Sequence, residues 1–383
     1  MSQSHALRPC KGSSGNGMTA NRKQGAISNV VEPSQPAAAR SPETSGTRAS
    51  RDRSSSLTMR LSPDRRYRLR QSALDLTFLF VVIQVGSIVA GLIDPNGFAY
   101  ASSVNILTAL EAIPLLGITA VGVGLLMITG EFDLSVGSNF IFSSIVMAML
   151  ASRGWPPLLA ALVALAIGCG IGLLNGLITL WARIPSLITT IGTNGIWGAA
   201  TLFVHGAASQ SFNVSGVSAT IMSGTIGDFP AEFFWMIGVA VLAWAFLQRH
   251  KIGNHFFAVG GNQRSANATG IRVKRTKLIA FGVAGTLAAL AGVLAAARVN
   301  TITPGGETDL PLQVIGACVI GGTALMGGRG TVLGMVLGSA LLYWIEDVLL
   351  LLGAPGFYLD AFVGALIIVA AAAYAVTHYR RVM

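Results

Sequence analysis

Ten apolar segments separated by polar connections constrain the fold of this chain more than any other feature of its sequence. Hydrophobic residues make up 52% of the chain and charged residues only 11%, well below the roughly 25% charged residues of a soluble domain. Most of the segments reach the ~20 residues that a helix needs to cross a bilayer. Lipid offers no hydrogen-bond partner to an exposed backbone, which favours helices as the spanning structure. We therefore predict an all-α integral membrane protein of about ten transmembrane helices, at residues 73–93, 104–128, 137–152, 157–181, 187–205, 232–248, 277–297, 312–327, 331–352 and 359–377. The segment 312–327 is short and interrupted by glycines, so a re-entrant segment is the alternative there.

Basic residues gather on one side of these predicted helices. Residues 1–70 contain thirteen of the 26 lysines and arginines but only four acidic residues, and the connection 249–277 contains seven more of the basic ones. Cytoplasmic connections of membrane proteins are enriched in Lys and Arg. The pattern predicts a multi-pass chain whose N- and C-termini are both cytoplasmic. It also attributes the net charge of +10 to membrane orientation rather than to nucleic-acid binding.

The first 70 residues differ from the rest of the chain. They are rich in Ser, Arg, Gly, Pro and Ala and show no hydrophobic periodicity. Such a segment buries too little apolar surface to offset the entropy of ordering, so we predict a disordered basic tail over 1–70 and a transmembrane domain over 71–383. The tail has no apolar run like the core of a signal peptide. Met59 begins a compact basic leader directly before the first apolar segment and is an alternative start of the chain.

Glycines recur every four residues in two of the predicted helices. Gly168, Gly172 and Gly176 lie on one helix face, and so do Gly334 and Gly338. Small residues at this spacing let helix backbones approach closely in a membrane, where no hydrophobic effect draws helices together. We interpret these glycines as helix-packing residues rather than as substrate contacts.

The polar stretch between the second and third segments carries the strongest functional signal. It places two carboxylates and several glycines beside apolar helices, in the order Thr129-Gly130-Glu131-Phe132-Asp133-Leu134-Ser135-Val136-Gly137-Ser138. Charged groups at membrane depth are costly and usually mark a pathway, a gate or a docking site. The stretch resembles the signature Gly-Gly-Ile-Asp-Leu-Ser-Val-Gly-Ser of the ribose-type (monosaccharide) permease subunits of ABC importers, within the branched-chain amino acid/sugar permease family. The matching positions are held by Gly130, Asp133, Leu134, Ser135, Gly137 and Ser138.

Further stretches resemble the same family in the expected order, so that the resemblance covers essentially residues 73–377. Residues 172–176 are similar to Gly-Leu-x-Asn-Gly, and residues 183–193 to Ile-Pro-x-Phe-Ile-x-Thr-Leu-Gly-Thr. Near the end, residues 321–330 resemble Gly-Gly-Thr-Ser-Leu-x-Gly-Gly-x-Gly. Several motifs in order and at the expected spacing are far more specific than any one of them alone.

The connection 249–277 contains the remaining motif of the family. The pattern Ala-x-Gly-x-Asn, followed by small residues and Gly-Ile-x-Val-x-x-x-Lys, is matched here by Ala258, Gly260, Asn262, Ala266, Gly270, Ile271, Val273 and Lys277. Residues 263–269 are compatible with two turns of helix, which Gly270 terminates. A short cytosolic helix would give an ATPase subunit a rigid element to push on. Charge alone favours an ordinary basic loop at the lipid headgroups, and it is the resemblance to the family pattern that favours docking of an ATPase.

The resemblance implies the type II ABC importer permease architecture. That architecture has ten helices in each of two permease subunits, forming a homodimer or a heterodimer with a related permease around a translocation pathway. Its partners are membrane lipid, two cytosolic ABC ATPase subunits that bind the ATP, and a periplasmic sugar-binding protein. The implied place is the bacterial cytoplasmic (inner) membrane. The implied solute is a monosaccharide or a related polyhydroxylated compound, and the chain itself needs no cofactor and is not an enzyme.

Two departures from the family pattern add charge. Glu131 replaces a glycine of the signature, and we expect it to form a salt bridge with an inner-face arginine such as Arg183. Glu346 and Asp347 stand where many relatives have Asn or Asn-Gly, and we expect them to reach the membrane interface. Glu111 is more deeply embedded. Because carboxylates accept hydrogen bonds from hydroxyl groups, Glu111 and Glu346 are candidates for a mouth that admits polyols.

A permease that only transmits its solute is expected to line the pathway with weakly polar side chains rather than with a tight binding site. Polar residues within the apolar segments and the motifs are the candidates. They are Glu111, Asn175, Thr189, Thr193, Asn194, Gln313 and Glu346.

Catalytic and metal-binding motifs are missing from the sequence. It contains no Gly-x-x-x-x-Gly-Lys-Ser/Thr phosphate loop, no His-Glu-x-x-His and no Cys-x-x-Cys, so we predict neither catalytic residues nor a metal site. The alternative to an ABC permease is an ion-coupled secondary transporter, which would also use broken helices and embedded carboxylates. The lack of an evident embedded Asp/Lys or Asp/Arg pair counts against it. A membrane-bound enzyme has still less support, since no nucleophile or metal constellation is present.

Overall fold

The computed structural model describes residues 78, 80–94, 98–305, 309–355, 357, 358, 361–365, 367–369 and 372. The predicted tail over 1–70 and the alternative start at Met59 lie outside the described residues. So do the beginning of the predicted segment 73–93 and much of the predicted segment 359–377. These predictions therefore stay untested.

Six helices of the described part are long and apolar enough to cross a membrane, and each matches a predicted segment to within a few residues. Their ends agree because the apolar runs are bounded by turn-forming and charged residues. The six are α2 (Ser103–Ile128), α4 (Pro157–Ala182), α5 (Ser186–His205), α7 (Ala231–Arg249), α10 (Val273–Val299) and α12 (Val332–Leu351).

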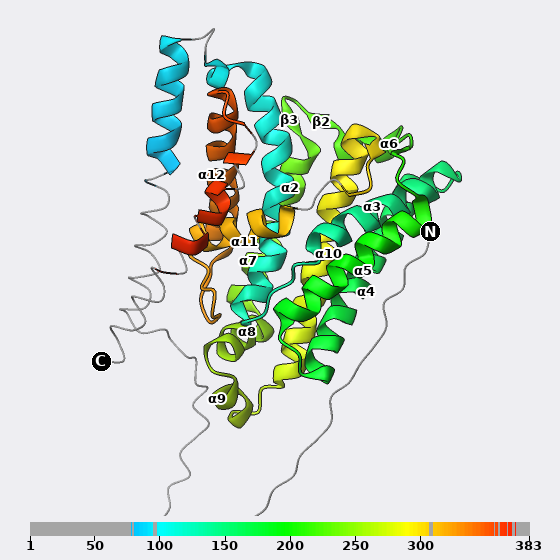
Figure 1. The fold of residues 1–383 in the computed structure, drawn as a ribbon, viewed down its shortest axis with the longest axis vertical. Helices are drawn as coiled ribbons and strands as arrows, with labels where there is room; N and C mark the ends of the chain where they lie inside the picture. Colours follow the sequence, from blue (N-terminus) through cyan, green and yellow to red (C-terminus); the bar gives the residue numbers. More distant parts are fainter. Residues whose placement is uncertain are drawn as a thin grey trace, which may run out of the picture. The chain divides into compact units, whose positions relative to one another are not determined.

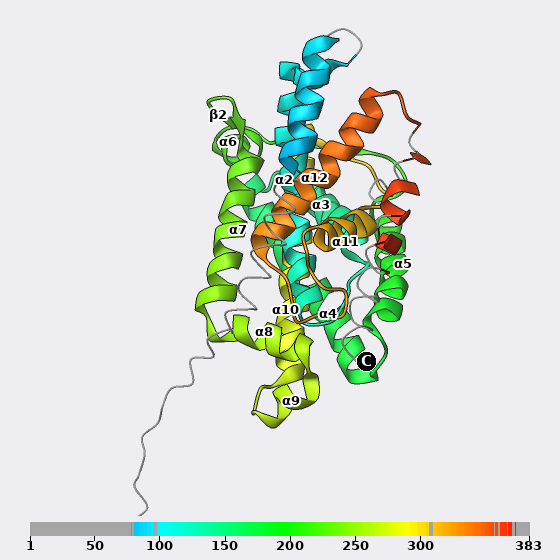
Figure 2. The same cartoon turned by 90° about the vertical axis from the view of Figure 1, so that its left-hand side faces the viewer.

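Three further apolar helices are shorter, so the described residues do not establish ten spans. They are Phe80–Ile93, α3 (Val136–Ser152) and α11 (Leu310–Ile320). The prediction of a transmembrane helix over 312–327 is wrong in its extent, because α11 has 11 residues and the chain after Ile320 forms turns. A helix of that length covers only about 16 Å, half of the hydrocarbon core. Figure 2 shows α11 lying across the direction of its longer neighbours.

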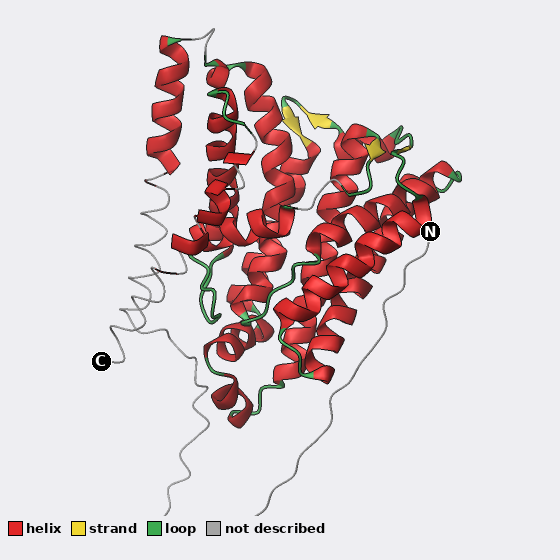
Figure 3. Ribbon diagram, viewed as in Figure 1, coloured by secondary structure: helices red, strands yellow, loops and turns green. Residues whose placement is uncertain are grey.

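The remaining elements lie at the two ends of the long helices. At the lower end in Figure 1 are α8 (Lys251–Gly261) and α9 (Gln263–Ala268). At the upper end are η1 (Ala99–Ala101), α6 (Val217–Ser223) and the strands β2 (Thr225–Ile226) and β3 (Phe229–Pro230). The strand β1 (Gln210–Ser211) pairs with β4 (Thr301–Ile302), and β2 with β3, both antiparallel. Figure 3 shows how small these strands are beside the helices.

Helix α10 lies at the centre of the packing, against α2, α3 and α4. Its closest contact is with the glycine face of α4. A Cβ atom added to Gly172 would lie 2.2 Å from the backbone oxygen of Phe281, and one added to Gly168 would lie 2.8 Å from that of Gly285. Only glycine permits backbones this close, which confirms the predicted packing role of the Gly168-Gly172-Gly176 face.

The second pair of spaced glycines has the same function between α11 and α12. A Cβ atom on Gly338 would lie 2.1 Å from the oxygen of Ala317, and one on Gly334 would lie 2.1 Å from that of Gly321. This contact holds the short helix α11 against a long one.

The outer surface of the helices is apolar, and some of their buried faces are polar. On α5, the side chains of Phe203 and Ile196 are 92% and 64% exposed, whereas the buried positions are all Ser or Thr. Large exposed apolar side chains also line α4 and α7. This inversion suits helices whose outer faces meet lipid or another apolar subunit rather than water.

Candidate functional site

The segment predicted to couple to an ATPase folds into α8, α9 and the first turns of α10. The N-terminus of α9 is capped by Asn262, whose Oδ1 accepts a hydrogen bond from the backbone N–H of Ser265 at 3.0 Å. Beyond its C-terminus, Gly270 adopts a φ of 83°, and the N–H of Ile271 donates to the oxygen of Ala266 at 3.0 Å. The predicted helix over 263–269 and its termination at Gly270 are therefore confirmed.

Helix α9 presents almost all of its side chains to the surroundings. Ala266, at 3% exposed, is its one buried residue, and the other five are exposed. Figure 2 shows α9 below α8, at the end of the molecule farthest from β2. Some of the predicted coupling residues are thus exposed, and the others anchor the coupling segment to the rest of the protein. Those on the anchoring side are wholly or partly buried, namely Ala258, Gly260, Ala266, Ile271, Val273 and Lys277.

Four glycines from three different segments meet where this coupling segment reaches the helices, and we call their meeting point the glycine junction. Gly130 follows α2, Gly260 lies near the end of α8, and Gly327 and Gly328 lie between α11 and α12. The N–H of Gly328 donates to the oxygen of Ile128 at 2.8 Å. A Cβ atom on Gly260 would lie only 1.8 Å from that same oxygen. The backbones touch here, which explains why the motifs in these segments need glycine.

The signature aspartate is the centre of a buried hydrogen-bond cluster. Asp133, at 1% exposed, accepts from the backbone N–H of Ser135 at 2.8 Å and from its hydroxyl at 2.7 Å. The Nδ2 group of Asn175 on α4 donates to Asp133 Oδ2 at 3.2 Å and to Ser135 Oγ at 2.6 Å. Burial raises the pKa of Asp133, whereas the hydrogen bonds from Ser135 and Asn175 lower it. The cluster fixes the start of α3 against α4.

The other signature residues extend this arrangement. The hydroxyl of Ser138 donates to the backbone oxygen of Ser135 at 2.9 Å, which closes the first turn of α3. Gly137 is buried in that turn, and Leu134 packs against the hydrophobic core. In this fold the signature acts as a rigid turn between α2 and α3.

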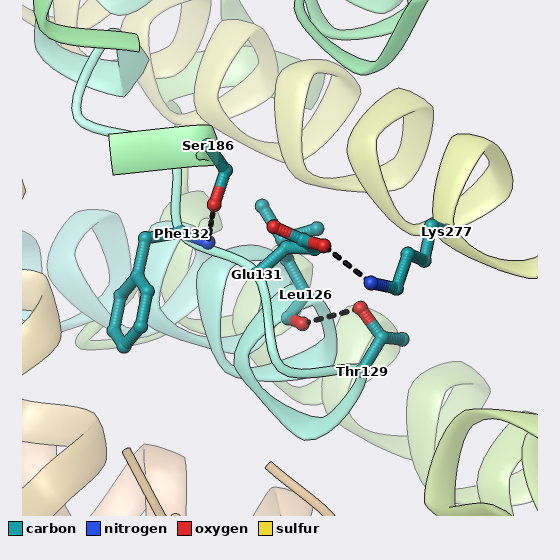
Figure 4. A network of polar contacts seen from close by, with 6 residues as sticks. All are labelled: Leu126, Thr129, Glu131, Phe132, Ser186 and Lys277. Carbon is teal, nitrogen blue, oxygen red and sulfur yellow. Dashed lines mark hydrogen bonds and ion pairs between the residues drawn. The ribbon is translucent and has the colours of Figure 1, made fainter. Parts of the chain in front are cut away.

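Glu131 forms a largely buried ion pair, but not with the predicted partner. Its carboxylate pairs with the ammonium group of Lys277, in the second turn of α10, and the two side chains are 13% and 4% exposed. The predicted salt bridge with Arg183 is thus corrected, because Arg183 is exposed at the C-terminus of α4 and Lys277 points into the loop that carries Glu131. The next residue, Phe132, donates its N–H to Ser186 Oγ at 3.1 Å (Figure 4).

Three candidate pathway residues lie on α5. Thr189 and Thr193 are buried, each at 7% exposed, and Asn194 is half-buried. Helix α5 packs mainly against α3 and less extensively against α4. Asn175 also comes from a buried position, within the Asp133 cluster. Their part in a pathway remains a prediction, and the same holds for the half-buried Gln313 on α11.

The remaining candidates lie toward the other end of the helices. Glu111 Oε2 lies 3.4 Å from Nη1 of Arg298, in the last turn of α10. Glu111 and Glu346 both lie within electrostatic range of Tyr343 on α12, as does Arg298. The two carboxylates proposed for a polyol mouth and Arg298 therefore all lie near Tyr343.

Asp347 differs from the expectation that it reaches the interface. It is only 8% exposed and accepts a hydrogen bond from Nδ2 of Asn105 at 2.8 Å. Asn105 also donates to the backbone oxygen of Tyr100 in η1 at 3.2 Å. Burial in the first place, and the nearby Asp347 in addition, raise the pKa of Tyr100 to about 12. Its hydroxyl donates to Gln84 at 2.7 Å. Asp347 thus joins α12 to the start of α2.

Comparison with known proteins decides the family. The family model described as branched-chain amino acid transport system / permease component matches residues 105–371. The chain belongs to this permease family. It is 31% identical over 305 residues to the autoinducer 2 import system permease protein LsrC of Yersinia enterocolitica, covering 79% of this chain and 82% of that protein.

A second relative of the permease is also named for sugar import. The xylose/arabinose import permease protein XylH of Sulfolobus acidocaldarius is 34% identical over 304 residues, which covers 76% of the permease and 83% of that protein. No solved structure matches the permease. The family is a class of transporter component, and the long apolar helices agree with a multi-pass membrane protein.

Two charged residues that were not placed from the sequence have defined positions in the fold of the permease. Glu232 is completely buried in the first turn of α7, within electrostatic range of Arg298 and Glu111. Arg298 pairs with Glu111. A carboxylate at the first turn of a helix that follows a proline is a helix-start signal, and it could have placed Glu232 inside α7.

No group of three or more His, Cys, Asp or Glu side chains that could hold a metal ion occurs among the residues of the permease that the structure describes. Cys318 is buried between α11 and α2, where its thiol donates to the backbone oxygen of Ala120 at 3.2 Å. It has a packing role.

Proposed function

We propose that this permease forms the translocation pathway of an ABC importer for a monosaccharide or a related polyhydroxylated solute. Relatives named for the import of autoinducer 2 and of xylose and arabinose support the substrate class. The observation that supports coupling to an ATPase is the short, exposed helix α9. The adjoining helix α8 contacts the signature loop backbone-to-backbone at the glycine junction.

The proposed assembly contains two permease subunits, identical or related, in the cytoplasmic membrane. Two cytosolic ATPase subunits bind the ATP and contact α9, and a periplasmic binding protein delivers the solute at the opposite end. In this arrangement both termini of the permease are cytoplasmic. The exposed apolar faces of α4, α5 and α7 contact lipid or the second permease subunit.

Transport in this proposal works by alternating access. When the ATPases close on ATP, they move α8 and α9, and the glycine junction passes the movement to the ends of α2 and α12 because backbones in contact cannot slide freely. The subunits rock against each other and open the pathway to the loaded binding protein. Candidate lining residues are Glu111, Asn175, Thr189, Thr193, Asn194, Gln313 and Glu346.

An ion-coupled secondary transporter remains the second candidate, for one reason. The structure contains two carboxylate–cation pairs, the largely buried Glu131 with Lys277 and the more exposed Glu111 with Arg298. Such pairs serve ion coupling in some transporters. Dependence of uptake on an ATPase separates the two functions.

Replacement of Gly270 tests the ATPase contact. Gly270 has a φ of 83°, where a residue with a Cβ atom costs roughly 1–2 kcal/mol and a β-branched residue is especially unfavourable. We expect Gly270→Val to insert into the membrane normally yet to lose the co-purifying ATPase and ATP-driven uptake. Gly270→Asn is the matched control, because Asn tolerates this conformation, and it should keep both. If Gly270→Val retains the ATPase and full uptake, α9 is not the contact.

A further inference from the structure

We propose that the ion pair between Glu131 and Lys277 is a positioning contact that transmits the movement of α9 to α5. The proposal rests on the importer function above and adds a specific route within the subunit. Neither residue is assigned to touch solute. The family signature has glycine at the position of Glu131, so the pair is a feature of this chain rather than of the signature.

The route begins at the coupling helix. Only the short connection through Gly270 and Ile271 separates α9 from α10, and the Ile271 N–H is bonded back to Ala266 of α9. Displacement of α9 therefore acts directly on the first turns of α10. Lys277 lies in the second of these turns and is 4% exposed, so its side chain is held within the protein.

The ion pair carries the route into the signature loop. Glu131 lies between α2 and α3 and points toward Lys277, as Figure 4 shows. The same loop is held at its start by the hydroxyl of Thr129, which donates to the oxygen of Leu126 at 2.7 Å. The loop is therefore held to α2 by a hydrogen bond and to α10 by the ion pair. When these two helices separate, the loop must follow one of them.

The route ends on a helix with candidate pathway residues. Phe132, next to Glu131, donates its N–H to Ser186 Oγ at the first residue of α5. Thr189 and Thr193 lie on the buried face of α5, one and two turns farther along. Movement of α9 thereby reaches α5 through one ion pair and one hydrogen bond.

A buried ion pair suits such a contact better than an apolar one. Replacing a buried pair by apolar residues is often neutral for stability, whereas removing one partner leaves an uncompensated charge. What the pair adds is a fixed geometry between two segments that are 146 residues apart in sequence. Loss of that geometry should impair coupling more than assembly.

The test measures the amount of solute imported per ATP hydrolysed, using the complete complex of permease, ATPase and binding protein in liposomes. The neutral pair Glu131→Gln with Lys277→Met removes both charges together and should assemble with its ATPase. We expect the solute imported per ATP to fall by about tenfold. This factor corresponds to a typical interaction energy between contacting residues. The reversed pair, Glu131→Lys with Lys277→Glu, should recover most of the loss.

Arg183→Gln is the matched control, because it removes an exposed charge from the same end of the helices without touching the ion pair. It should keep the wild-type ratio. The proposal is overturned if the neutral pair imports as much solute per ATP as wild type, or if the reversed pair does no better than the neutral pair. Absence of ATP-driven uptake in the wild-type complex would instead contradict the importer function itself.

Discussion

Gly260→Ala is expected to prevent the permease from accumulating as a folded membrane protein. The added Cβ atom would lie 1.8 Å from the backbone oxygen of Ile128 and 2.6 Å from the backbone nitrogen of Gly328. Both are backbone atoms, and the Gly328 nitrogen already donates to the Ile128 oxygen. Neither can move without separating α8 from the end of α2. We expect a cost at or above the upper end of the usual range for overpacking, about 3 kcal/mol.

The neighbouring glycine provides the control for this change. A Cβ atom on Gly261 would meet no atom within 4 Å, so Gly261→Ala adds the same methyl group at the next position without a clash. The measurement is the yield of monodisperse protein after extraction into detergent. Equal yields of the two variants would show that the glycine junction is not packed as described.

Asp133→Ala is expected to lower uptake strongly while leaving membrane insertion intact. The change removes the acceptor for the N–H and hydroxyl of Ser135, and one of the two acceptors for Nδ2 of Asn175, all of them buried. Each buried donor left without a partner costs about 1–3 kcal/mol. The start of α3 then loses its fixed position relative to α4. We expect uptake to decrease by about tenfold or more, because the lost hydrogen bonds hold the turn that contains the family signature.

Two variants make this prediction specific. Asp133→Asn keeps an acceptor for Ser135 and should retain more uptake than Asp133→Ala. Ser138→Ala removes only one local hydrogen bond within the first turn of α3 and should behave close to wild type. If Asp133→Ala showed normal uptake with protein present at the wild-type level, the signature would not be needed for transport.

The sequence predicted the long helices and the coupling helix well because their signals are local. The bounds of α2 follow from a largely apolar run, and those of α9 from Asn262 at one end and Gly270 at the other. The packing role of Gly172 could be predicted for the same reason, since four-residue spacing is visible in one segment.

Contacts between distant segments could not be predicted in the same way. Glu131 was expected to pair with Arg183, yet it pairs with Lys277. Lys277 had been assigned only to the motif of the coupling segment. The chain after α11 is apolar enough to suggest a full span, with a re-entrant segment as the alternative, but the close contact of Gly321 with α12 could not be predicted. Hydropathy does not contain that information.

The importer function is tested most directly by uptake into liposomes. The solute would be one that stabilises the partner binding protein in a thermal-shift screen, and the permease would be reconstituted with and without its ATPase. We predict uptake only when the ATPase, ATP and the loaded binding protein are all present, and no effect of collapsing the ion gradients. Uptake by the permease alone, driven only by an ion gradient, would contradict the importer function and favour a secondary transporter.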